Sequence, residues 1–564
     1  MQARGIEVRR AALGTRAGAR TDRAGANRVT ASADFEEEAL DLKMRVNSVD
    51  LELFRHQLVS IAEEMGTVLR KTSYSANIKE RRDYSCAVYT AGGETVAMGD
   101  HMPVHLGAMP LSVRAVTRAF DLQPGDVAIV NDPFQGGTHL PDITAVMPVF
   151  LKGAKRASFY VANRAHHADV GGMSPGSMPM AREIYQEGLR LPPVMLVRKG
   201  KVDGDLLRLI LANVRTPVER EGDILSQWMS LQRGEQRLHA LSARHGKRLH
   251  PLLAALLDYS ERMMRAAIAR LPGGEYRFED CLDSDGLTAR PVWIRVCIAL
   301  RGGEATVDFT GSSAQAAGPV NANLAIALAA SMYVFRCLIR EDVPFTSGLM
   351  RPIRLIAPEG SVVNAMAPAA MAAGNVETSQ RITDVLLGAL AQAAPDRIPA
   401  ASSGTMNNLS FGGWDPIRER PFAYYETIAG GMGAHARNAG LSATHTHMTN
   451  SWNTPVEAFE HLYPLRIRAY KIRGGSGGNG LHRGGDGIVR EYEFLTDADV
   501  TILSDRRERG PYGLNGGAAG RPGANTLVRA NKTAPLRAKT NFPVGAGDVL
   551  RIETPGGGGW GEVK

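Results

Sequence analysis

Cysteines and long apolar runs are scarce in this sequence of 564 residues. Its four cysteines, Cys86, Cys281, Cys297 and Cys337, are widely spaced and form no C-x-x-C pair, which argues against a disulfide framework. A reducing cytoplasm is therefore the expected location. The longest apolar run, residues 324–335, is shorter than the roughly 18 residues that span a bilayer, so it predicts a buried helix and we expect no membrane partner.

A strong charge of one sign is also missing from most of the chain. The formal net charge is +8, but much of the excess lies in the arginine-rich first 31 residues, and the remainder is nearly balanced. We therefore expect no nucleic-acid partner. Hydrophobic residues make up 44% and charged residues 22%, which is typical of a globular protein, and the length allows several domains or one large body.

Motifs that bind nucleotide phosphates are absent or out of context. The sequence contains no G-x-x-x-x-G-K-[ST], so the chain has no P-loop. Residues 475–480 match G-x-G-x-x-G, but they are not framed by the strand and helix that a dinucleotide-binding fold requires. We therefore expect no cofactor-binding residues for a nucleotide within this chain.

One short motif, in contrast, occurs twice. His139-Leu-Pro-Asp142 and His166-His-Ala-Asp169 are both H-x-x-D sequences. Imidazole and carboxylate groups are typical ligands of a catalytic divalent metal ion. A single copy would more often cap a turn or bind the backbone, so the prediction of a metal site depends on the pair.

The residues between the two copies predict a β-hairpin. Residues 143–151 and 157–162 are rich in β-branched and aromatic side chains, whereas residues 152–156 are charged and contain a glycine. A hairpin folded at residue 154 places Asp142 opposite His166 and His139 opposite Asp169, with facing Cβ atoms roughly 4.5–5.5 Å apart. Four side chains would then converge on one ion. Pro148 fits an edge strand or a bulge better than a central strand.

The pattern along the whole chain predicts an α+β fold: a large, multilobed, glycine-rich mixed fold with β-hairpins around a metal site and a β-rich C-terminal part. Helical spacing of apolar residues is clearest over residues 50–71. Further helices are expected over residues 235–270, interrupted at Pro251, and over 322–340 and 378–394. Strands and turns are expected over 72–165, over 289–310 and after residue 400.

Composition suggests where the chain divides. Residues 1–43 are rich in alanine and arginine, and we expect them to be a disordered tail. Residues 44–561 are expected to form the folded body. Within it we predict a metal-bearing lobe, a helical and mixed middle, and a β-rich C-terminal lobe, at residues 44–230, 231–395 and 396–564.

A second histidine motif, His445-Thr-His447, offers another interpretation. An H-x-H on a strand begins the metal-ligand set of amidohydrolase barrels, but about 200 or more residues must follow it in such a barrel, and fewer follow here. We expect this pair to line a pocket with Asn450, Asn453 and Glu457, or to be structural.

Motifs between residues 46 and 561 resemble the hydantoinase B/oxoprolinase family. The clearest is Asn131-Asp-Pro-Phe-Gln-Gly-Gly-Thr-His-Leu-Pro-Asp142. The other matching segments are residues 71–83, 100–107, 165–172, 188–193, 213–217, 374–379, 449–457, 504–507 and 554–561. The matches are long and stand in the family's order, so the resemblance covers nearly all of the chain except the N-terminal tail.

The resemblance implies a reaction shared between two subunits. In this family a separate A-type subunit binds ATP and phosphorylates a carbonyl or enol oxygen of the substrate, and the B-type subunit completes the reaction at a metal centre. This chain would be the B-type subunit, in a hetero-oligomer with the A-type ATPase, and ATP would act through that partner. The absence of a P-loop agrees with this division of labour.

The family's metal site, carried onto this sequence, falls on His139, Asp142 and His166, and the expected ion is divalent Mn, Zn or Fe. His166 is preferred to His167 because only His166 keeps the H-x-x-D spacing. Asp169 is a candidate for a fourth or neighbouring group. The candidates for moving the catalytic proton are Asp169, Asp132 and His105, and those for binding phosphate or substrate are Arg81, Arg82, Arg190, His447 and Asn450.

The expected function is hydrolysis of a small cyclic amide, either a hydantoin or a lactam, after its carbonyl has been phosphorylated. The alternative is the large subunit of an ATP-dependent ketone carboxylase of the acetone or acetophenone type. We favour hydrolysis because the sequence lacks the long extra segments associated with those carboxylase subunits. A non-catalytic scaffold is a third interpretation, which the presence of the metal-ligand motif argues against.

Overall fold

A seven-stranded antiparallel sheet organises the first third of the protein in the computed structural model, which describes residues 46–99 and 101–563. The strand order is β2-β1-β5-β4-β3-β6-β7. The predicted tail at residues 1–43 and Asp100 lie outside the described residues. The strands are β1 (Tyr84–Thr90), β2 (Thr95–Met98), β3 (Val127–Val130), β4 (Asp142–Val149), β5 (Phe159–His166), β6 (Val194–Arg198) and β7 (Lys201–Val202).

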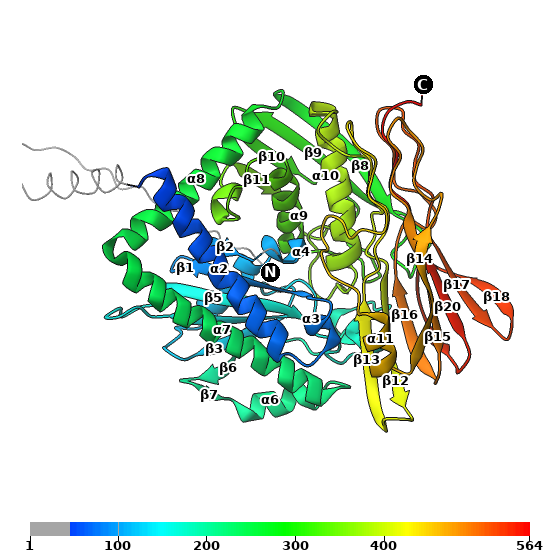
Figure 1. Cartoon of the computed structure of the whole chain (residues 1–564), viewed down its shortest axis with the longest axis horizontal. Coiled ribbons are helices and arrows are strands. Elements are labelled where there is room, and N and C mark those ends of the chain that lie inside the picture. The colour runs from blue at the N-terminus through cyan, green and yellow to red at the C-terminus, as the bar shows by residue number, and fades with distance from the viewer. Residues whose placement is uncertain (1–45, 100, 564) are drawn as a thin grey trace, which may run out of the picture. The chain divides into compact units, whose positions relative to one another are not determined.

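Helices cover both faces of this sheet. The long helices α2 (Ser48–Thr72) and α7 (Pro217–His245) pack along each other and against β1 and β5 (Figure 1). Asn163 in β5 donates to the carbonyl of Gln227 in α7, whereas the next residue, Arg164, donates to Ser112 in α5 (Met109–Ala119). Because successive strand residues point to opposite faces, α7 and α5 lie on opposite sides of the sheet.

The predicted helix at residues 50–71 is confirmed as α2, and its buried face follows the helical repeat through Phe54, Leu58, Ile61, Met65 and Leu69. The prediction of strands and turns alone over residues 72–165 is wrong. That segment also contains three helices, and two of them carry a proline in the first turn, where no backbone N–H is needed. The helices are α3 (Ala76–Lys79), α4 (Pro103–Leu106) and α5.

The predicted helix at residues 235–270 is two helices, and its break is not at Pro251. Helix α7 ends at His245, and Gly246, with a φ of 53°, adopts the left-handed region that glycine tolerates. Helix α8 (Leu249–Ala269) then contains Pro251 in its first turn, where proline is tolerated. The chain therefore turns at the glycine and not at the proline.

The middle of the chain forms a second sheet backed by helices. Its order is β11-β10-β9-β8, and helix α10 (Ser379–Ala393) packs on β8 and β9 and against α9 (Leu324–Cys337). These two helices confirm the predictions at 322–340 and 378–394. The strands are β8 (Gly274–Leu282), β9 (Val292–Arg301), β10 (Glu304–Asp308) and β11 (Ile353–Ile356).

Two further sheets share one aromatic core at the C-terminal end, where their strands lie side by side in Figure 1. One has the order β13-β12-β16-β19 and the other β14-β15-β20-β17-β18. Their strands are β12 (Asn408–Asp415), β13 (Arg420–Glu426), β14 (Leu465–Arg473), β15 (Gly487–Phe494), β16 (Ala498–Leu503), β17 (Ala524–Arg529), β18 (Lys532–Leu536), β19 (Lys539–Val544) and β20 (Val549–Glu553). The expected α+β class with a β-rich C-terminal part is confirmed.

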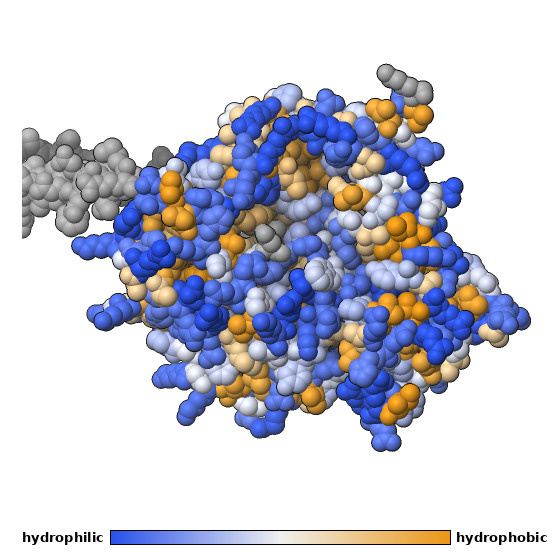
Figure 2. All heavy atoms as spheres, viewed as in Figure 1, coloured by the Kyte–Doolittle hydropathy of each residue, from blue (hydrophilic) through white to orange (hydrophobic). Residues whose placement is uncertain are grey.

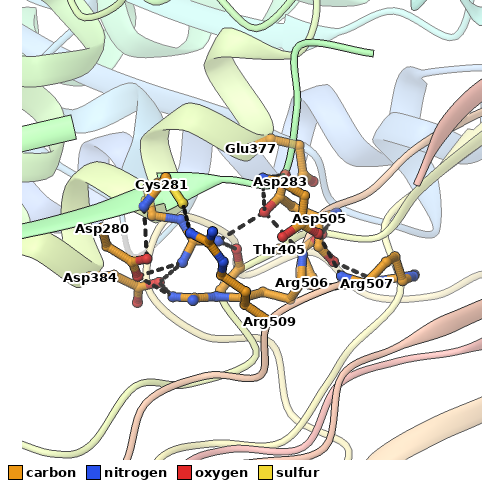
Figure 3. A network of polar contacts seen from close by, with 12 residues as sticks. Asp280, Cys281, Asp283, Glu377, Asp384, Thr405, Asp505, Arg506, Arg507 and Arg509 are labelled. Atoms are coloured by element: carbon orange, nitrogen blue, oxygen red, sulfur yellow. Dashed lines mark hydrogen bonds and ion pairs between the residues drawn. The ribbon is translucent and has the colours of Figure 1, made fainter. Parts of the chain in front are cut away.

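A buried network of charged side chains ties these C-terminal sheets to α10 (Figure 3). Arg381 of α10 donates to Asp384 at 3.0 Å and to Asp505, which follows β16, at 3.1 Å. Arg506 donates to Asp384 at 2.7 Å, and Lys539 of β19 donates to Asp505 at 2.6 Å. Carboxylates removed from water in this way are tolerated because Asp384 and Asp505 each have two opposite partners.

Residues Ser48–Lys564 form one compact unit, and the division of the body into three lobes stays a prediction. Figure 2 shows hydrophilic residues over most of the visible face, with scattered apolar patches between them. Such a mixture is normal for a surface in contact with water. Within the described ranges, we find no helix with both the length and the apolar character needed to cross a bilayer.

Candidate metal centre

The hairpin predicted between the two H-x-x-D motifs is formed by β4 and β5. Asp142 pairs with His166 in register, as expected, and the exposed turn spans residues 150–158. The expected pairing of His139 with Asp169 does not occur, because β4 begins at Asp142 and β5 ends at His166. Pro148 lies in a central strand, but the pairing of β4 with β3 stops at Val146, so that ladder does not require its missing N–H.

His139 reaches the same place from the loop that precedes β4. Asn131 holds this loop, because its amide donates to the Leu140 and Leu189 carbonyls and its oxygen accepts from the Leu191 N–H. A Cβ atom on Gly137 would lie 2.2 Å from the Asn131 carbonyl oxygen, so only glycine fits this close approach. The tight loop places His139 beside the first residue of β4.

His139, Asp142 and His166 form a buried group with the geometry of a metal site. Asp142 Oδ1 lies 3.1 Å from His139 Nε2 and 3.3 Å from His166 Nδ1, and one ligand atom from each residue falls within 4.8 Å of the others. Two ligand atoms about 2.0–2.2 Å from one tetrahedral ion lie roughly 3.3 Å apart. The three residues are at most 2% exposed.

The hydrogen bonds around this group fit a bound cation. His139 Nδ1 lies 3.1 Å from the Ala372 carbonyl oxygen, which can only accept, so Nδ1 carries the hydrogen and Nε2 presents a lone pair. That lone pair faces Asp142 Oδ1, which has no hydrogen-bond partner among the described residues. A cation between two acceptors at this distance would stabilise the pair, so these residues fit a divalent metal ion.

The electrostatics of the group keep Asp142 ionised. Burial alone would raise the pKa of Asp142, but His139 and His105 hold it well below its usual range. Burial lowers the pKa of His166, although Asp142 opposes this shift. The His166 ring stacks on Tyr425, with centroids 4.3 Å apart and planes at 16°. Asp142 is therefore held as an anionic carboxylate, and burial favours the neutral ring of His166.

His105 completes the ring of histidines around Asp142. Its Nε2 lies 3.3 Å from Asp142 Oδ2 and its Nδ1 lies 3.0 Å from Ser85 Oγ. Ser85 Oγ accepts from the Met102 N–H, so its own hydroxyl is free to donate to Nδ1. The Nε2 of His105 then carries the hydrogen and points it at the carboxylate, which places an exchangeable proton at the site.

Several residues of the site were not identified from the sequence. Asn375 donates to Asp142 Oδ2 at 3.2 Å and lies 3.1 Å from His139 Nε2. Ala372 provides the carbonyl for His139, and Tyr425 provides the stacking ring. The backbone carbonyl of Asp83, a residue that is 5% exposed, accepts a hydrogen bond from the backbone N–H of His166. Asp83 and Asn375 lie in two of the family segments, which is the only signal that points to them.

The structure does not bring Asp132 or Asp169 into this group. Asp132 accepts from the Phe134 N–H and the Gln135 amide, so it stabilises the turn of its own loop. Asp169 accepts from three backbone N–H groups and from the Arg215 guanidinium at 2.9 Å. Both carboxylates are used to hold loops, so neither resembles an available base.

The three candidate arginines lie in different surroundings. Arg81 is buried and donates to the Tyr425 carbonyl at 3.0 Å, with its guanidinium 5.0 Å from that ring. The Arg82 guanidinium lies 3.5 Å from the exposed Trp452 ring. Arg190 lies 3.6 Å from Asp132 and faces Tyr185. Of the three, only Arg81 contacts Tyr425, the residue whose ring stacks on His166.

His447 and Asn450 line a cavity of about 400 Å³ together with Pro103, Tyr333 and Cys337. Pro103 begins helix α4, which carries His105. His447 Nδ1 lies 3.4 Å from the Tyr333 hydroxyl, and burial lowers the pKa of His447 to about 4, so its ring is neutral at pH 7. The rest of the wall is mainly apolar, from Val334, Leu338, Leu387, Ile398 and Met432.

Known proteins resemble this chain over nearly its full described length. It is 39% identical to 5-oxoprolinase 1 of Arabidopsis thaliana over 94% of this chain, although it spans only 43% of that protein. It is 31% identical to the B component of a D-/L-hydantoinase from a Pseudomonas species, covering 92% of this chain and 91% of that one.

A solved structure is also similar to this chain over nearly its full length. The ATP-dependent caprolactamase of Pseudomonas jessenii superposes with a TM-score of 0.85 at 28% identity, covering 92% of each chain. The family model for hydantoinase B/oxoprolinase matches residues 47–563. The chain therefore belongs to the hydantoinase B/oxoprolinase family.

Proposed function

We propose that this chain is the catalytic B-type subunit of an ATP-dependent cyclic-amide hydrolase. Its substrate is a hydantoin or lactam whose carbonyl oxygen has been phosphorylated by an A-type partner subunit. An amide carbonyl is a poor electrophile because of resonance, and phosphorylation of its oxygen creates a leaving group. The single observation that carries the proposal is the buried His139–Asp142–His166 group, in which two acceptor atoms face each other at 3.1 Å.

In this proposal, some residues of the site hold a metal ion and another residue transfers a proton. His139, Asp142 and His166 would hold a divalent Mn, Zn or Fe ion, which supplies Lewis-acid chemistry and makes water more acidic. His105 is 1% exposed and directs its Nε2 hydrogen at Asp142, so it exchanges a proton at the edge of the group. Arg81 supports Tyr425, whose ring covers His166 and limits the access of water.

The cavity of about 400 Å³ at His447 is the site we propose for the ring of the substrate. Its size falls within the usual range for small ligands, and its mainly apolar wall suits a lactam ring. Neutral His447 and Asn450 offer hydrogen bonds without a charge. Cys337 lines the same cavity, so a bound lactam should slow alkylation of Cys337 while leaving Cys297 unaffected; equal labelling with and without 2-pyrrolidinone would contradict this placement.

Two adjacent histidines provide a matched test of the metal centre. His166 and His167 are both buried, but His167 bonds to Gln227 at 3.0 Å and is not part of the group. We expect His166→Asn to lose most of the metal that copurifies with the protein, and His167→Asn to retain it, as measured by plasma mass spectrometry. Equal metal content in the two variants would refute the site.

The activity is tested by producing the chain together with an A-type ATPase subunit. ATP hydrolysis is then measured with hydantoins, 5-oxoproline, simple lactams and ketones, each with and without bicarbonate. We expect turnover with a cyclic amide that does not depend on bicarbonate and that is lost in Asp142→Asn. Turnover with ketones only when bicarbonate is present would overturn the proposal in favour of a ketone carboxylase.

A further inference from the structure

Glu187 has a buried carboxyl group that takes no part in the proposed chemistry. It follows a short 3-10 turn, η2 (Ile184–Gln186), and is fully buried. Its Oε1 accepts from the backbone N–H of Met371 at 2.7 Å and from that of Ala372 at 2.8 Å. Its Oε2 has no partner among the described residues. One oxygen of this carboxyl group therefore holds two consecutive peptide N–H groups.

Those peptides belong to a segment that borders the metal centre, residues 368–375, which we call the strap. The Ala372 N–H points to Glu187, and the Ala372 carbonyl lies 3.1 Å from His139 Nδ1. Asn375, near the end of the strap, contacts both His139 and Asp142. A single strap residue, Ala372, thus connects the Glu187 carboxyl group to the ring of a proposed metal ligand.

Other hydrogen bonds hold the strap on both sides of these two N–H groups, and the Met371 carbonyl accepts from the Gly374 N–H at 3.1 Å. The Pro368 carbonyl accepts from the Ile184 N–H at 2.9 Å, and the Ala370 carbonyl accepts from the Asn321 amide at 2.9 Å. The Ala373 N–H donates to the Pro319 carbonyl at 2.8 Å. None of these contacts involves the N–H of Met371 or the N–H of Ala372. Both of these groups donate to Glu187.

We propose that Glu187 is a positioning residue for the metal centre. It holds the N–H groups of Met371 and Ala372, and together with the bond from the Ala373 N–H to the Pro319 carbonyl it orients the Ala372 carbonyl to accept the Nδ1 hydrogen of His139. Since one nitrogen of a neutral imidazole carries the hydrogen, this bond keeps the lone pair on Nε2, the atom that faces Asp142 and the ion. The inference rests on the proposed metal at this site and not on the identity of the substrate.

The test uses variants that separate the acceptor from the bulk of the side chain. Glu187→Met keeps a similar length but cannot accept either N–H, whereas Glu187→Gln keeps an acceptor oxygen. Asp126→Leu is a matched control, because Asp126 is 7% exposed and also accepts from two backbone N–H groups, those of Gln123 and Lys199. Its partners lie away from the metal group, so it reports the general effect of losing such a carboxylate.

Metal affinity is measured by competition with a chelator, using Co²⁺ and Zn²⁺, and the visible absorption of the Co²⁺ protein reports the ligand geometry. We expect Glu187→Met to weaken metal affinity by about 10–100-fold and to change the Co²⁺ spectrum. Glu187→Gln should restore affinity to within about 3-fold of the wild type, and Asp126→Leu should leave affinity and spectrum unchanged. If Glu187→Met does not fold, Glu187→Asp should show about a 10-fold loss, because its acceptor is one methylene short.

Three results would overturn the inference. They are an unchanged affinity in a folded Glu187→Met protein, equal losses of affinity in Glu187→Met and Asp126→Leu, and a wild-type protein that binds no metal. The readout is independent of activity, so a failure to find cyclic-amide hydrolysis would refute the proposed function and leave the role of Glu187 standing.

Discussion

Replacement of Glu377 by glutamine should remove a pH-dependent part of the protein's stability. Glu377 is fully buried in the π-helical turn η5 (Gly374–Thr378), where its Oε1 accepts from the Met406 N–H and from the Asn408 amide. Its Oε2 has no partner within the described residues. Burial, reinforced by the charge of Asp505, raises the pKa of Glu377 to about 7 from an ordinary value of 4.5.

The sign of the effect follows from this shift. Between pH 4.5 and 7, Glu377 keeps its proton in the folded state and releases it in the unfolded state. The resulting stabilisation of the folded state is complete below pH 4.5 and is lost as pH rises through 7. At about 1.4 kcal/mol per pKa unit, the loss between pH 5 and pH 8 is about 2.5 kcal/mol. Glutamine keeps an acceptor at Oε1 and does not titrate.

The assay is urea-induced unfolding followed by fluorescence at pH 5, 6, 7 and 8. The free energy of unfolding of Glu377→Gln relative to the wild type should rise by about 2.5 kcal/mol over this range. Glu359→Gln, at an exposed position, should show no such trend. A constant difference between Glu377→Gln and the wild type across pH would mean that Glu377 does not retain its proton, and the reasoning would fail.

Other predictions concern the charge network and the tight loop. Arg381→Met leaves the buried carboxylates of Asp384 and Asp505 and the partly exposed Asp280 short of a partner, and should cost about 3–5 kcal/mol in denaturant unfolding. Arg277→Met, at an exposed pair, should change stability by less than about 1 kcal/mol; equal losses would contradict this account. Gly137→Ala should lower both the melting temperature and the metal content, because its Cβ would collide with backbone. Gly92→Ala, with no atom closer than 3.7 Å, should leave both within error, and a Gly137→Ala protein with normal metal content would refute the packing argument.

The part of the site that sequence reasoning could predict is the part that is local. The hairpin was predictable because strand propensity, a charged turn and a period of two fix which residues face each other, and Asp142 pairs with His166 as expected. The expected pairing of His139 with Asp169 failed, because both residues lie beyond the ends of the strands. Strand geometry no longer applies there, and backbone N–H groups and Arg215 compete for the Asp169 carboxylate.

The rest of the site depends on contacts between distant parts of the chain. Asn375 and Ala372 reach His139 from more than 230 positions away, and Tyr425 comes from the C-terminal sheets. No periodicity in the sequence reports such contacts. The helices α3, α4 and α5 were missed for a different reason, because short helices with proline in the first turn resemble turns when only the sequence is considered.

The turn and the strands of the β4–β5 hairpin should differ in how well they tolerate inserted residues. At its closed end, residues 150–158 are largely exposed and make no contact with the metal group, so insertions there should be accepted and offer a place for a label or an affinity tag. Within the strands, adding a single residue would turn every following side chain to the other face and carry His166 away from Asp142. Changes in length should therefore be tolerated in the turn and not within the two strands.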